Sequence, residues 1–405
     1  MQKLAPTLRF PEFESSWVED SIENLVLSYK LGGNYQNSIE ENEYPLIKMG
    51  NVGRGYFITN KLEYITGETP SLDDEILEGD LFFNTRNTLD LVGKVAVWRG
   101  ELPKAYYNSN LLRLKFKNNY FYNYVFNSYW GLKKLKRIAS GTTSVAAIYT
   151  KDLMRLKVAA PQNSLEQRKI ADFITLVDKK LSLLKEKYTL LIQYKKGVMQ
   201  KLLKQETRFK DGSGSNFSDW ITERVDYFVD RYSEPVEVEP NKLYRQIGIR
   251  SHGKGIFHKE NVQGHELGDK RVFWVHPDAF VVNIVFAWEH AVAKTSKDEQ
   301  GFIASHRFPM YLPKDDRVDL RFFTLFFLSK RGKYLLELAS PGGAGRNKTL
   351  GQNNFAELKV TFPCLEEQKR IADFNDALEE KLEAAKKQIE LTQTFKKGLL
   401  QQMFV

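Results

Sequence analysis

Two short turns carry the residues best suited to hold a phosphate group. Gly53-Arg54-Gly55 and Gly253-Lys254-Gly255 each place one cation between two glycines. A turn of this kind can bring backbone N–H groups and a positive charge against a phosphate. The same pattern also suits an ordinary tight turn with a solvated base at its tip. Both interpretations stay open from the turns alone.

Other polar loop residues could read the edges of DNA bases. Arginine can form two hydrogen bonds with guanine, and asparagine or glutamine can do the same with adenine. The candidates in the first half of the chain are Asn51, Arg54, Arg86, Asn87, Lys94, Asn108 and Arg113. The candidates in the second half are Arg250, Lys254, Lys294, Arg307, Arg346 and Lys348. Ordinary surface polarity also explains each of them taken alone.

No catalytic motif accompanies these residues. The sequence lacks a Gly-x-x-x-x-Gly-Lys-Ser/Thr loop, a Gly-x-Ser-x-Gly elbow and a His-Glu-x-x-His zinc motif. The spacing of His252, His258 and His265 fits no common metal site, and the single cysteine, Cys364, excludes an internal disulfide. We therefore predict a chain that binds and positions, with no catalytic residue, metal or cofactor of its own.

The charge distribution favours a polyanionic partner. The formal net charge is +9, of which residues 1–205 carry +8 and residues 206–405 carry +1. From Leu102 to Lys151 there are nine lysines or arginines and eleven aromatic residues but no acidic residue. Such a stretch is typical of nucleic-acid-binding surfaces, although a solvated basic face is the alternative. With no signal peptide and no apolar run near ~18 residues, we expect a cytoplasmic protein without a membrane span.

The elements that must position these residues come in two copies. QRKIADF at 167–173 returns as QKRIADF at 368–374, and residues 167–203 share 13 identities in 37 positions with 368–404. Trp17-Val18 likewise returns as Trp220-Ile221. All such offsets fall between 200 and 203 residues, and chance cannot keep so many matches in register. The polar and glycine-rich residues 211–216 predict a flexible connector between the copies.

Each copy begins with a mixed domain. Runs such as DLFFNT, KVAVW, FVVNIVFAW and NLLRLKF predict short strands. YNYVFNSYWGLKKL and FFTLFFLSKRGKYLLEL predict helices. The aromatic run 120–130 could stack on bases, but its counterpart contains no tyrosine, so we favour a buried helix face in both copies. The fold class is therefore α+β with an internal two-fold repeat.

Each copy ends in a long helix with a coiled-coil seam, because apolar residues recur at alternating spacings of four and three. The seam of the first helix is Ile170, Ile174, Val177, Leu181, Leu184, Tyr188 and Leu191, with a later break at Lys195. The second seam contains Ile371, Leu378, Leu382, Ile389 and Leu399, weakened by Asn375, Thr392 and Lys396. Each helix would run roughly 55 Å. We expect the two to pair antiparallel, with the mixed domains at opposite ends.

The whole pattern resembles the specificity subunit of a type I restriction–modification system. The resemblance covers essentially the full chain, and the helix openings LEQRKIADF and LEEQKRIADF are its most specific part. Looser pieces are the LRF…W entry, GDLFFNTRNTLDLVGKVAVW, VVNIVFAWEHAVA, the ASG and ASPGG turns and NKTLGQNNF.

The resemblance implies target recognition domains at 1–163 and 217–363, spacer helices at 164–205 and 364–405, and a linker at 206–216. Each recognition domain would bind one half of a split double-stranded DNA sequence. The helices would fix the unread gap and carry two adenine methyltransferase subunits, which in turn support the restriction and translocation subunits. S-adenosylmethionine, ATP and magnesium would belong to those partners.

Two alternatives come from other classes of protein. One is a coiled-coil scaffold whose mixed domains bind proteins, and the other is an RNA-binding adaptor. Sequence-specific DNA binding that needs both copies separates the first hypothesis from both alternatives.

Overall fold

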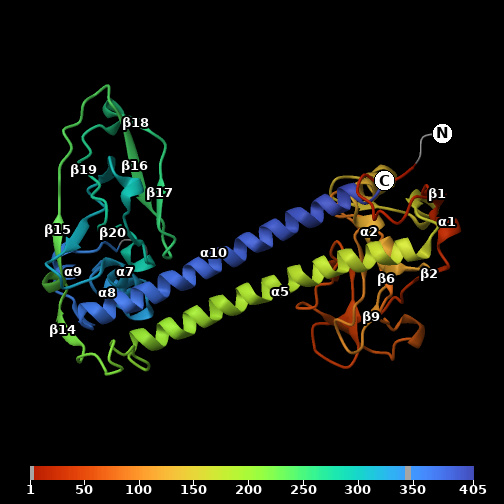
Figure 1. Ribbon diagram of the computed structural model, residues 1–405, viewed down its shortest axis with the longest axis horizontal. Coiled ribbons are helices and arrows are strands. Elements are labelled where there is room, and N and C mark those ends of the chain that lie inside the picture. Colours follow the sequence, from red (N-terminus) through yellow and green to blue (C-terminus); the bar gives the residue numbers. More distant parts are fainter. Residues whose placement is uncertain (1–3, 343–347) are drawn as a thin grey trace. The chain divides into compact units, whose positions relative to one another are not determined.

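The computed structural model describes residues 4–342 and 348–405. The chain forms two compact units, the first made of Met1–Glu186 with Lys386–Val405 and the second of Lys187–Ala385. Two long helices, α5 (Ser164–Leu203) and α10 (Leu365–Gln402), therefore contribute residues to both units (Figure 1). The predicted α+β class and the two long helices are confirmed. Among the described residues, no helix is both long and apolar enough to span a membrane.

The first unit is built on an antiparallel sheet in the order β2-β10-β6-β8. Its strands are β2 (Ser28–Leu31), β10 (Leu111–Lys115), β6 (Leu81–Asn84) and β8 (Val95–Val97). Helices α2 (Asn119–Asn127) and α3 (Tyr129–Ile138) follow. Phe83 of β6 packs edge-on against Phe126 of α2, with 6.2 Å between the ring centres. The strands predicted from DLFFNT, KVAVW and NLLRLKF are confirmed.

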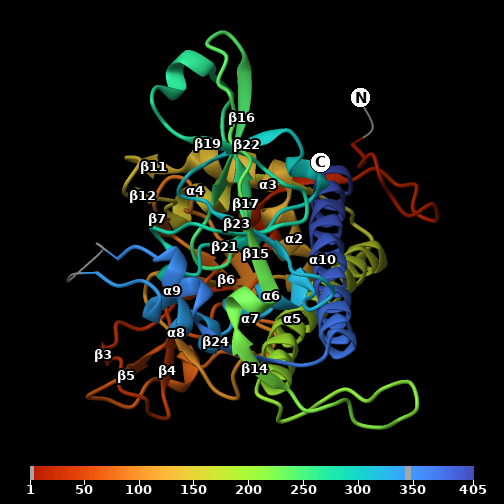
Figure 2. The same ribbon diagram turned by 90° about the vertical axis from the view of Figure 1, so that its left-hand side faces the viewer.

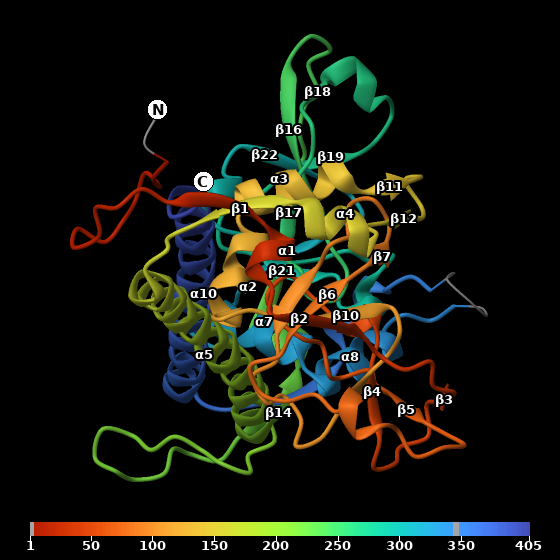
Figure 3. The same cartoon turned by 90° about the vertical axis from the view of Figure 1, so that its right-hand side faces the viewer.

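Two smaller sheets and a framework pair complete this unit. One is β3 (Asn37–Ser38), β5 (Glu63–Ile65), β4 (Pro45–Ile47) and β9 (Tyr106–Tyr107), in that order. The other joins β7 (Arg86–Asn87), β12 (Ala146–Ala147) and β11 (Ser140–Gly141), which lie together at one edge in Figure 3. Strand β1 (Val18–Ser21) pairs with β13 (Lys157–Ala160), and the short helices are α1 (Ile22–Leu25) and α4 (Thr150–Arg155).

The second unit repeats this framework. Its central sheet has the order β15-β23-β20-β21, from strands β15 (Val229–Tyr232), β23 (Met310–Pro313), β20 (Phe280–Val282) and β21 (Val292–Lys294). Helices α7 (Leu320–Leu328) and α8 (Lys330–Leu338) correspond to α2 and α3. Strand β14 (Ile221–Arg224) pairs with β24 (Lys359–Phe362) as β1 does with β13. The remaining short helices are α6 (Val225–Phe228) and α9 (Gln352–Ala356).

The second sheet is where the two units differ. In the second unit it runs β17-β16-β22-β19, with β18 also pairing with β16. The strands are β16 (Leu243–Ile249), β17 (Ile256–His258), β18 (Val262–Gln263), β19 (Val272–Trp274) and β22 (Phe302–Ser305). Strand β16, labelled in Figure 2, is the longest of these strands with 7 residues, and β18 pairs with its first two residues. Only the first part of FVVNIVFAW is a strand, because Asn283 accepts a hydrogen bond from the Val285 N–H and turns the chain.

The helix pairs α2–α3 and α7–α8 bend at equivalent serines. Ser128 and Ser329 cap the second helix of each pair, accepting from the N–H groups of Gly131 and Gly332. A Cβ on either glycine would lie 2.0 or 2.2 Å from a backbone oxygen of the preceding helix, so only glycine fits. The aromatic run 120–130 supplies core residues, among them Phe121, Tyr124 and Phe126, which confirms the buried helix face.

The long helices pair antiparallel inside each unit. In the first unit Ile170 and Ile174 of α5 share a core with Leu399 and Met403 near the end of α10. In the second, Met199 and Leu202 near the end of α5 share a core with Ile371 and Ala372 at the start of α10. Residue numbers thus rise along one helix as they fall along the other.

Candidate nucleic-acid interface

Three segments of the first unit meet in one surface, which we name loop surface 1: residues 50–57, 84–94 and 139–149. The Gly55 N–H donates to the Val95 carbonyl at 2.7 Å, and a guanidinium N–H of Arg54 donates to the Asp90 carbonyl at 3.0 Å. Backbone bonds from Leu89 to Thr143 and from Ile148 to Thr85 attach the third segment to the second. Hydrogen bonding therefore gathers segments that lie far apart in the sequence.

The second unit has the corresponding loop surface 2, made of residues 250–257, 283–291, 339–342 and 348–350. The His252 N–H donates to the Glu289 carbonyl at 2.6 Å, and the Gly253 N–H donates to the His290 carbonyl at 3.0 Å. The bond from Leu350 to Ile284 (2.8 Å) repeats the one from Ile148 to Thr85 (2.9 Å). The two glycine turns flagged in the sequence therefore occupy equivalent places.

Loop surface 1 carries positive charge without acidic partners. Arg86 is exposed and Arg54 and Lys94 are half-buried, and none of the three forms an ion pair with an acid in the described part of the chain. Burial lowers the pKa of Arg54, and burial together with the nearby Arg54 charge lowers the pKa of Lys94. Two uncompensated cations held close together favour the arrival of an anion, since an anion would relieve their repulsion. Asn87 lies beside Arg86, with its side-chain oxygen bonded to the Thr88 N–H.

Three candidates of the first unit make internal contacts or lie outside loop surface 1. Asn51 is buried, and its amide bonds to the Ile58 and Lys61 carbonyls and the Lys48 N–H. Arg113 is held by Asp80 and two backbone carbonyls and lies over the Tyr107 ring. Asn108 receives the Asn110 N–H next to β9, outside loop surface 1. Burial of Asn51 and the internal pairing of Arg113 argue against DNA contacts in this arrangement, and residue types alone do not reveal either property.

In the second unit, Arg250, Lys254 and Arg307 are exposed. Arg250 lies over the Phe257 ring at 4.7 Å, so its guanidinium is oriented rather than free to swing. Lys348 is half-buried with its ammonium group 5.8 Å from the centre of the Trp288 ring. Arg346 lies outside the described residues. These cations stay in the proposed contact set.

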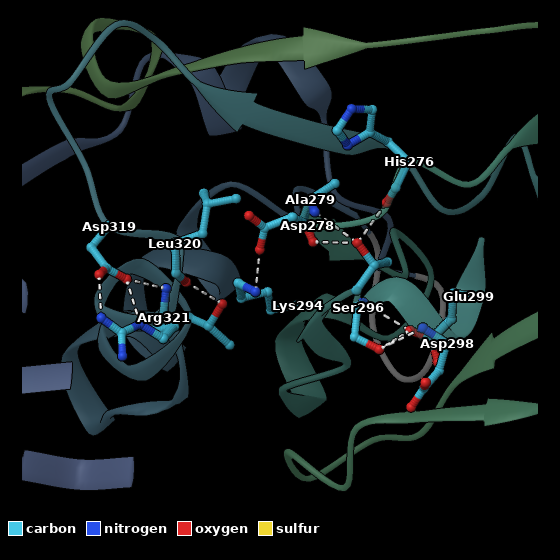
Figure 4. A network of polar contacts seen from close by, with 12 residues as sticks. His276, Asp278, Ala279, Lys294, Ser296, Asp298, Glu299, Asp319, Leu320 and Arg321 are labelled. Carbon is cyan, nitrogen blue, oxygen red and sulfur yellow. Dashed lines mark hydrogen bonds and ion pairs between the residues drawn. The ribbon is translucent and has the colours of Figure 1, made fainter. Parts of the chain in front are cut away.

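Lys294 is the exception in that unit. It forms an ion pair with Asp278, as Figure 4 shows, beside the hydroxyl of Thr295, which donates to the His276 carbonyl. Figure 4 also shows Asp319 at the start of α7, where its carboxylate accepts the Arg321 N–H and pairs with the Arg321 guanidinium. Lys294, the last residue of β21, is thus paired with the acid that precedes β20, and this internal ion pair competes with a DNA contact.

The histidines do not assemble into a metal site. His258 pairs with the buried Glu299 at 2.9 Å, and His265 lies on its own beside the Pro240 carbonyl. His290 is half-buried, and its pKa is lowered chiefly by burial. Within the described ranges 4–342 and 348–405, no group of three or more histidine, cysteine, aspartate or glutamate side chains could hold a metal ion.

A buried latch fixes each mixed domain to the start of its long helix. Glu166, which has no exposed surface, accepts from the Arg9 guanidinium at 2.7 and 2.9 Å and from the Trp17 indole at 3.0 Å. The second unit repeats it: Glu367 accepts from Arg208 at 3.1 and 2.7 Å and from the Trp220 indole at 3.2 Å. We call these latch 1 and latch 2.

The sequence analysis did not predict that the latch residues form a site. The signal was present, because arginine, tryptophan and glutamate recur at offsets of 199 to 203 residues. Their meeting was not visible, since about 150 residues separate Trp17 from Glu166. Aromatic contacts reinforce both latches: Phe10 meets Phe173 at 5.9 Å, and Phe209 meets Phe374 at 5.6 Å.

The lysines that interrupt the coiled-coil seams are paired as well. Lys396 of α10 bonds to Asp178 of α5 at 2.6 Å in the first unit, and Lys195 of α5 pairs with Glu379 of α10 in the second. Tyr124 of α2 also donates to Asp178, at 2.9 Å, so the mixed domain joins this network. The two pairs are equivalent under the repeat. Each seam lysine thus lies opposite an acid of the other helix.

The predicted seam positions lie on the less exposed side of each helix. Ile170, Ile174, Val177, Ile371, Leu378 and Leu399 are buried, whereas Leu181, Leu184, Tyr188, Leu191, Leu382 and Ile389 are half-buried. A second set of apolar side chains points to solvent in the first unit: Leu176, Leu183, Leu391 and Phe395 are 64, 56, 60 and 53% exposed. Exposed leucines and phenylalanine at this density on a helix pair are typical of a surface that a partner covers.

Comparisons with known proteins agree with this geometry. A family model described as type I restriction modification DNA specificity domain matches residues 29–193 and 280–393. A protein of Methanocaldococcus jannaschii, assigned as the specificity subunit of the type I restriction enzyme MjaX, is 23% identical over 428 residues. That alignment covers 96% of this chain and 93% of the other.

Two solved structures share the fold. The S subunit of a type I restriction–modification system from M. genitalium aligns with a TM-score of 0.57 at 15% identity, covering 99% of both chains. The HsdS subunit from Thermoanaerobacter tengcongensis aligns with a TM-score of 0.52 at 15% identity, covering 100% of this chain and 99% of the other. At these identities the likeness concerns the arrangement of the backbone.

Proposed function

Since the chain belongs to the family of type I restriction–modification DNA specificity domains, we propose that it reads a bipartite double-stranded DNA site. Each mixed domain would contact one half-site through its loop surface. The observation that carries this proposal is the repeated geometry, in which three distant segments form one loop surface in each unit. A duplicated reader implies a duplicated target.

The residues that we propose to contact DNA lie on the loop surfaces, except Arg307, which lies beside loop surface 2 because its carbonyl accepts the Ile284 N–H. They are Arg54, Arg86, Asn87 and Lys94 in the first unit and Arg250, Lys254, Arg307 and Lys348 in the second. Arg86 and Arg250 are the best candidates for base contacts, because arginine can bond guanine through two hydrogen bonds. The half-sites should differ in sequence, since the loop residues differ between the units.

The long helices would set the gap between the half-sites. Latches 1 and 2 support this role, because each ties a mixed domain to a fixed point at the start of a helix. A domain that is fixed at its helix cannot slide along it. The length of the helices would then fix the number of unread base pairs. We propose that recognition domains 1–163 and 217–363 read the half-sites and that helices 164–205 and 364–405 set the gap.

The partners that fit are two DNA methyltransferase subunits and, through them, restriction and translocation subunits. The exposed apolar side chains Leu176, Leu183, Leu391 and Phe395 support a protein partner on the helices. Methyl transfer with S-adenosylmethionine and ATP-driven cleavage with magnesium would take place in those subunits, in the cytoplasm. This chain would supply sequence recognition and a frame for assembly.

A methylation map of the source genome, with and without this gene, tests the proposal. We expect a split motif with a fixed gap, methylated on adenine and lost on deletion. A map that deletion leaves unchanged in an expressed, methylating system would overturn the proposal. It would favour a scaffold or an RNA-binding adaptor instead.

A further inference from the structure

A basic hollow of about 390 Å³ lies in the first unit, between the end of α3, the start of β11, helix α4 and the start of β13. Its lining residues are Arg137, Ile138, Ser140, Asp152, Arg155, Leu156 and Lys157. Three of the seven side chains are cationic and one is acidic. The loop-surface residues described above do not include its arginines.

The cations of the hollow have no internal partner. Arg137, Arg155 and Lys157 are all exposed, and within residues 4–342 and 348–405 no ion pair or side-chain hydrogen bond occupies them. Neighbouring bases of α3 are occupied: Lys134 pairs with Glu19 at 2.8 Å, and Lys136 pairs with Asp90 at 3.3 Å. Lys133 contacts the Trp130 ring and lies outside the hollow, whereas Arg137, Arg155 and Lys157 line the hollow together.

The second unit lacks this feature at the equivalent positions. The serine caps align α3 with α8, so Leu338 replaces Arg137. The pairs β1–β13 and β14–β24 align Lys157 with Lys359, so Glu357 replaces Arg155. Glu357 lies 3.7 Å from Arg224 and reverses the charge at that point. A hollow with three free cations is thus specific to the unit that carries most of the net charge.

We propose that this hollow binds a phosphate of the DNA backbone beside the half-site read by loop surface 1, which rests on the function proposed above. Ile138 and Leu156 offer no aromatic face for a base, whereas two guanidinium groups and the Ser140 hydroxyl suit phosphate oxygens. Ser140 begins β11, and β11 belongs to the small sheet of loop surface 1, so the hollow continues that surface. Binding at the hollow would be electrostatic and independent of the base sequence.

The test compares salt dependence in the full chain assembled with its methyltransferase subunits. The variant combines Arg137→Gln and Arg155→Gln. The matched control combines Lys115→Gln and Lys117→Gln, two exposed lysines outside the hollow, at and just beyond the end of β10 opposite to the Leu111–Asn84 pair. Both remove two positive charges. Each lost phosphate contact should reduce the slope of log K against log[salt] by about 0.9. The ratio of the DNA affinity of the unaltered chain to that of the variant should therefore fall by about 3.5-fold per lost contact when salt rises from about 50 to about 200 mM.

A gain-of-function variant guards against a folding artefact. Combining Leu338→Arg with Glu357→Arg builds the missing cations into the second unit, and we expect a steeper slope with the same methylated motif. If the Arg137→Gln, Arg155→Gln variant gave the same salt slope as the lysine control while the unaltered chain still bound its motif, the proposed function would stand and the proposal for the hollow would be refuted. Weakened assembly with the methyltransferase at an unchanged slope would also overturn it, in favour of an acidic protein partner. Loss of specific binding in the unaltered chain would instead refute the proposed function.

Discussion

Latch 1 should be the most sensitive point of the first unit. Glu166→Gln keeps the size of the side chain but removes its charge. The amide also offers one accepting oxygen in place of two, and it places an N–H₂ group next to the donors of Arg9 and Trp17. The carboxylate has no exposed surface and accepts three hydrogen bonds at 2.7 to 3.0 Å. Removing one partner of a buried ion pair costs about 3–5 kcal/mol.

The expected loss is at the lower end of that range. The Arg9 side chain keeps 12% exposure, so water can partly solvate the guanidinium once the carboxylate is gone. We therefore expect about 3 kcal/mol, or an opening equilibrium shifted by roughly 100-fold at 1.36 kcal/mol per tenfold. Most of it should be local, because Arg9 and Trp17 belong to the segment that leads into β1.

Hydrogen exchange followed by mass spectrometry measures this directly, since two linked units need not unfold in one transition. Amides of residues 4–17 should exchange roughly 100-fold faster in Glu166→Gln than in the unaltered chain. Glu186→Gln is the matched control, because it makes the same chemical change at an exposed position of α5. Glu367→Gln should produce the equivalent effect in residues 204–220. If Glu166→Gln exchanged like Glu186→Gln, the latch would carry no stability and the reasoning would be refuted.

Three further predictions concern packing, pH and the gap. Gly131→Ala should destabilise the first unit by about 1–3 kcal/mol, because the new Cβ would clash with the Val125 carbonyl. Gly197→Ala is the control, since Gly197 has open space around it on α5 and alanine there should stabilise the helix by up to about 1 kcal/mol. Thermal unfolding of the two variants measures the difference. Burial lowers the pKa of His290, so its contribution to stability is present above about pH 6.5 and is lost as pH falls below that value. His290→Asn is the comparison, because asparagine tolerates the left-handed backbone at this site (φ 59°). The free energies of unfolding of the unaltered chain and of this variant should converge as pH falls through that window. A difference that stays constant with pH would count against the lowered pKa. Inserting one heptad into each helix, after Glu186 and after Ala385, should lengthen the gap by about three base pairs at 1.5 Å per residue and 3.4 Å per base pair, as read from the methylated motif; an unchanged gap would show that the helices do not set it.

The long-range plan of the chain was readable in advance because it depends on local patterns. The four-three spacing of Ile170, Ile174 and Val177 states which side of α5 is buried, whatever covers it. The aromatic run of α2 showed its core role through its counterpart in α7. Individual site residues were less predictable. Asn51 and Arg113 have the same chemistry as Asn87 and Arg86, and only their surroundings make them internal supports instead of surface contacts.

The sequence by itself determined the duplication, the helices with their seams and the uneven charge, because periodicity and composition need no knowledge of distant neighbours. Tertiary structure decided which side chains are occupied. It brought Arg9 and Trp17 to Glu166, paired Lys396 with Asp178, held Lys294 on Asp278 and left Arg137 and Arg155 free around one hollow. Pairing depends on positions within a few ångströms of each other, and for residues in different elements only the folded chain sets those positions.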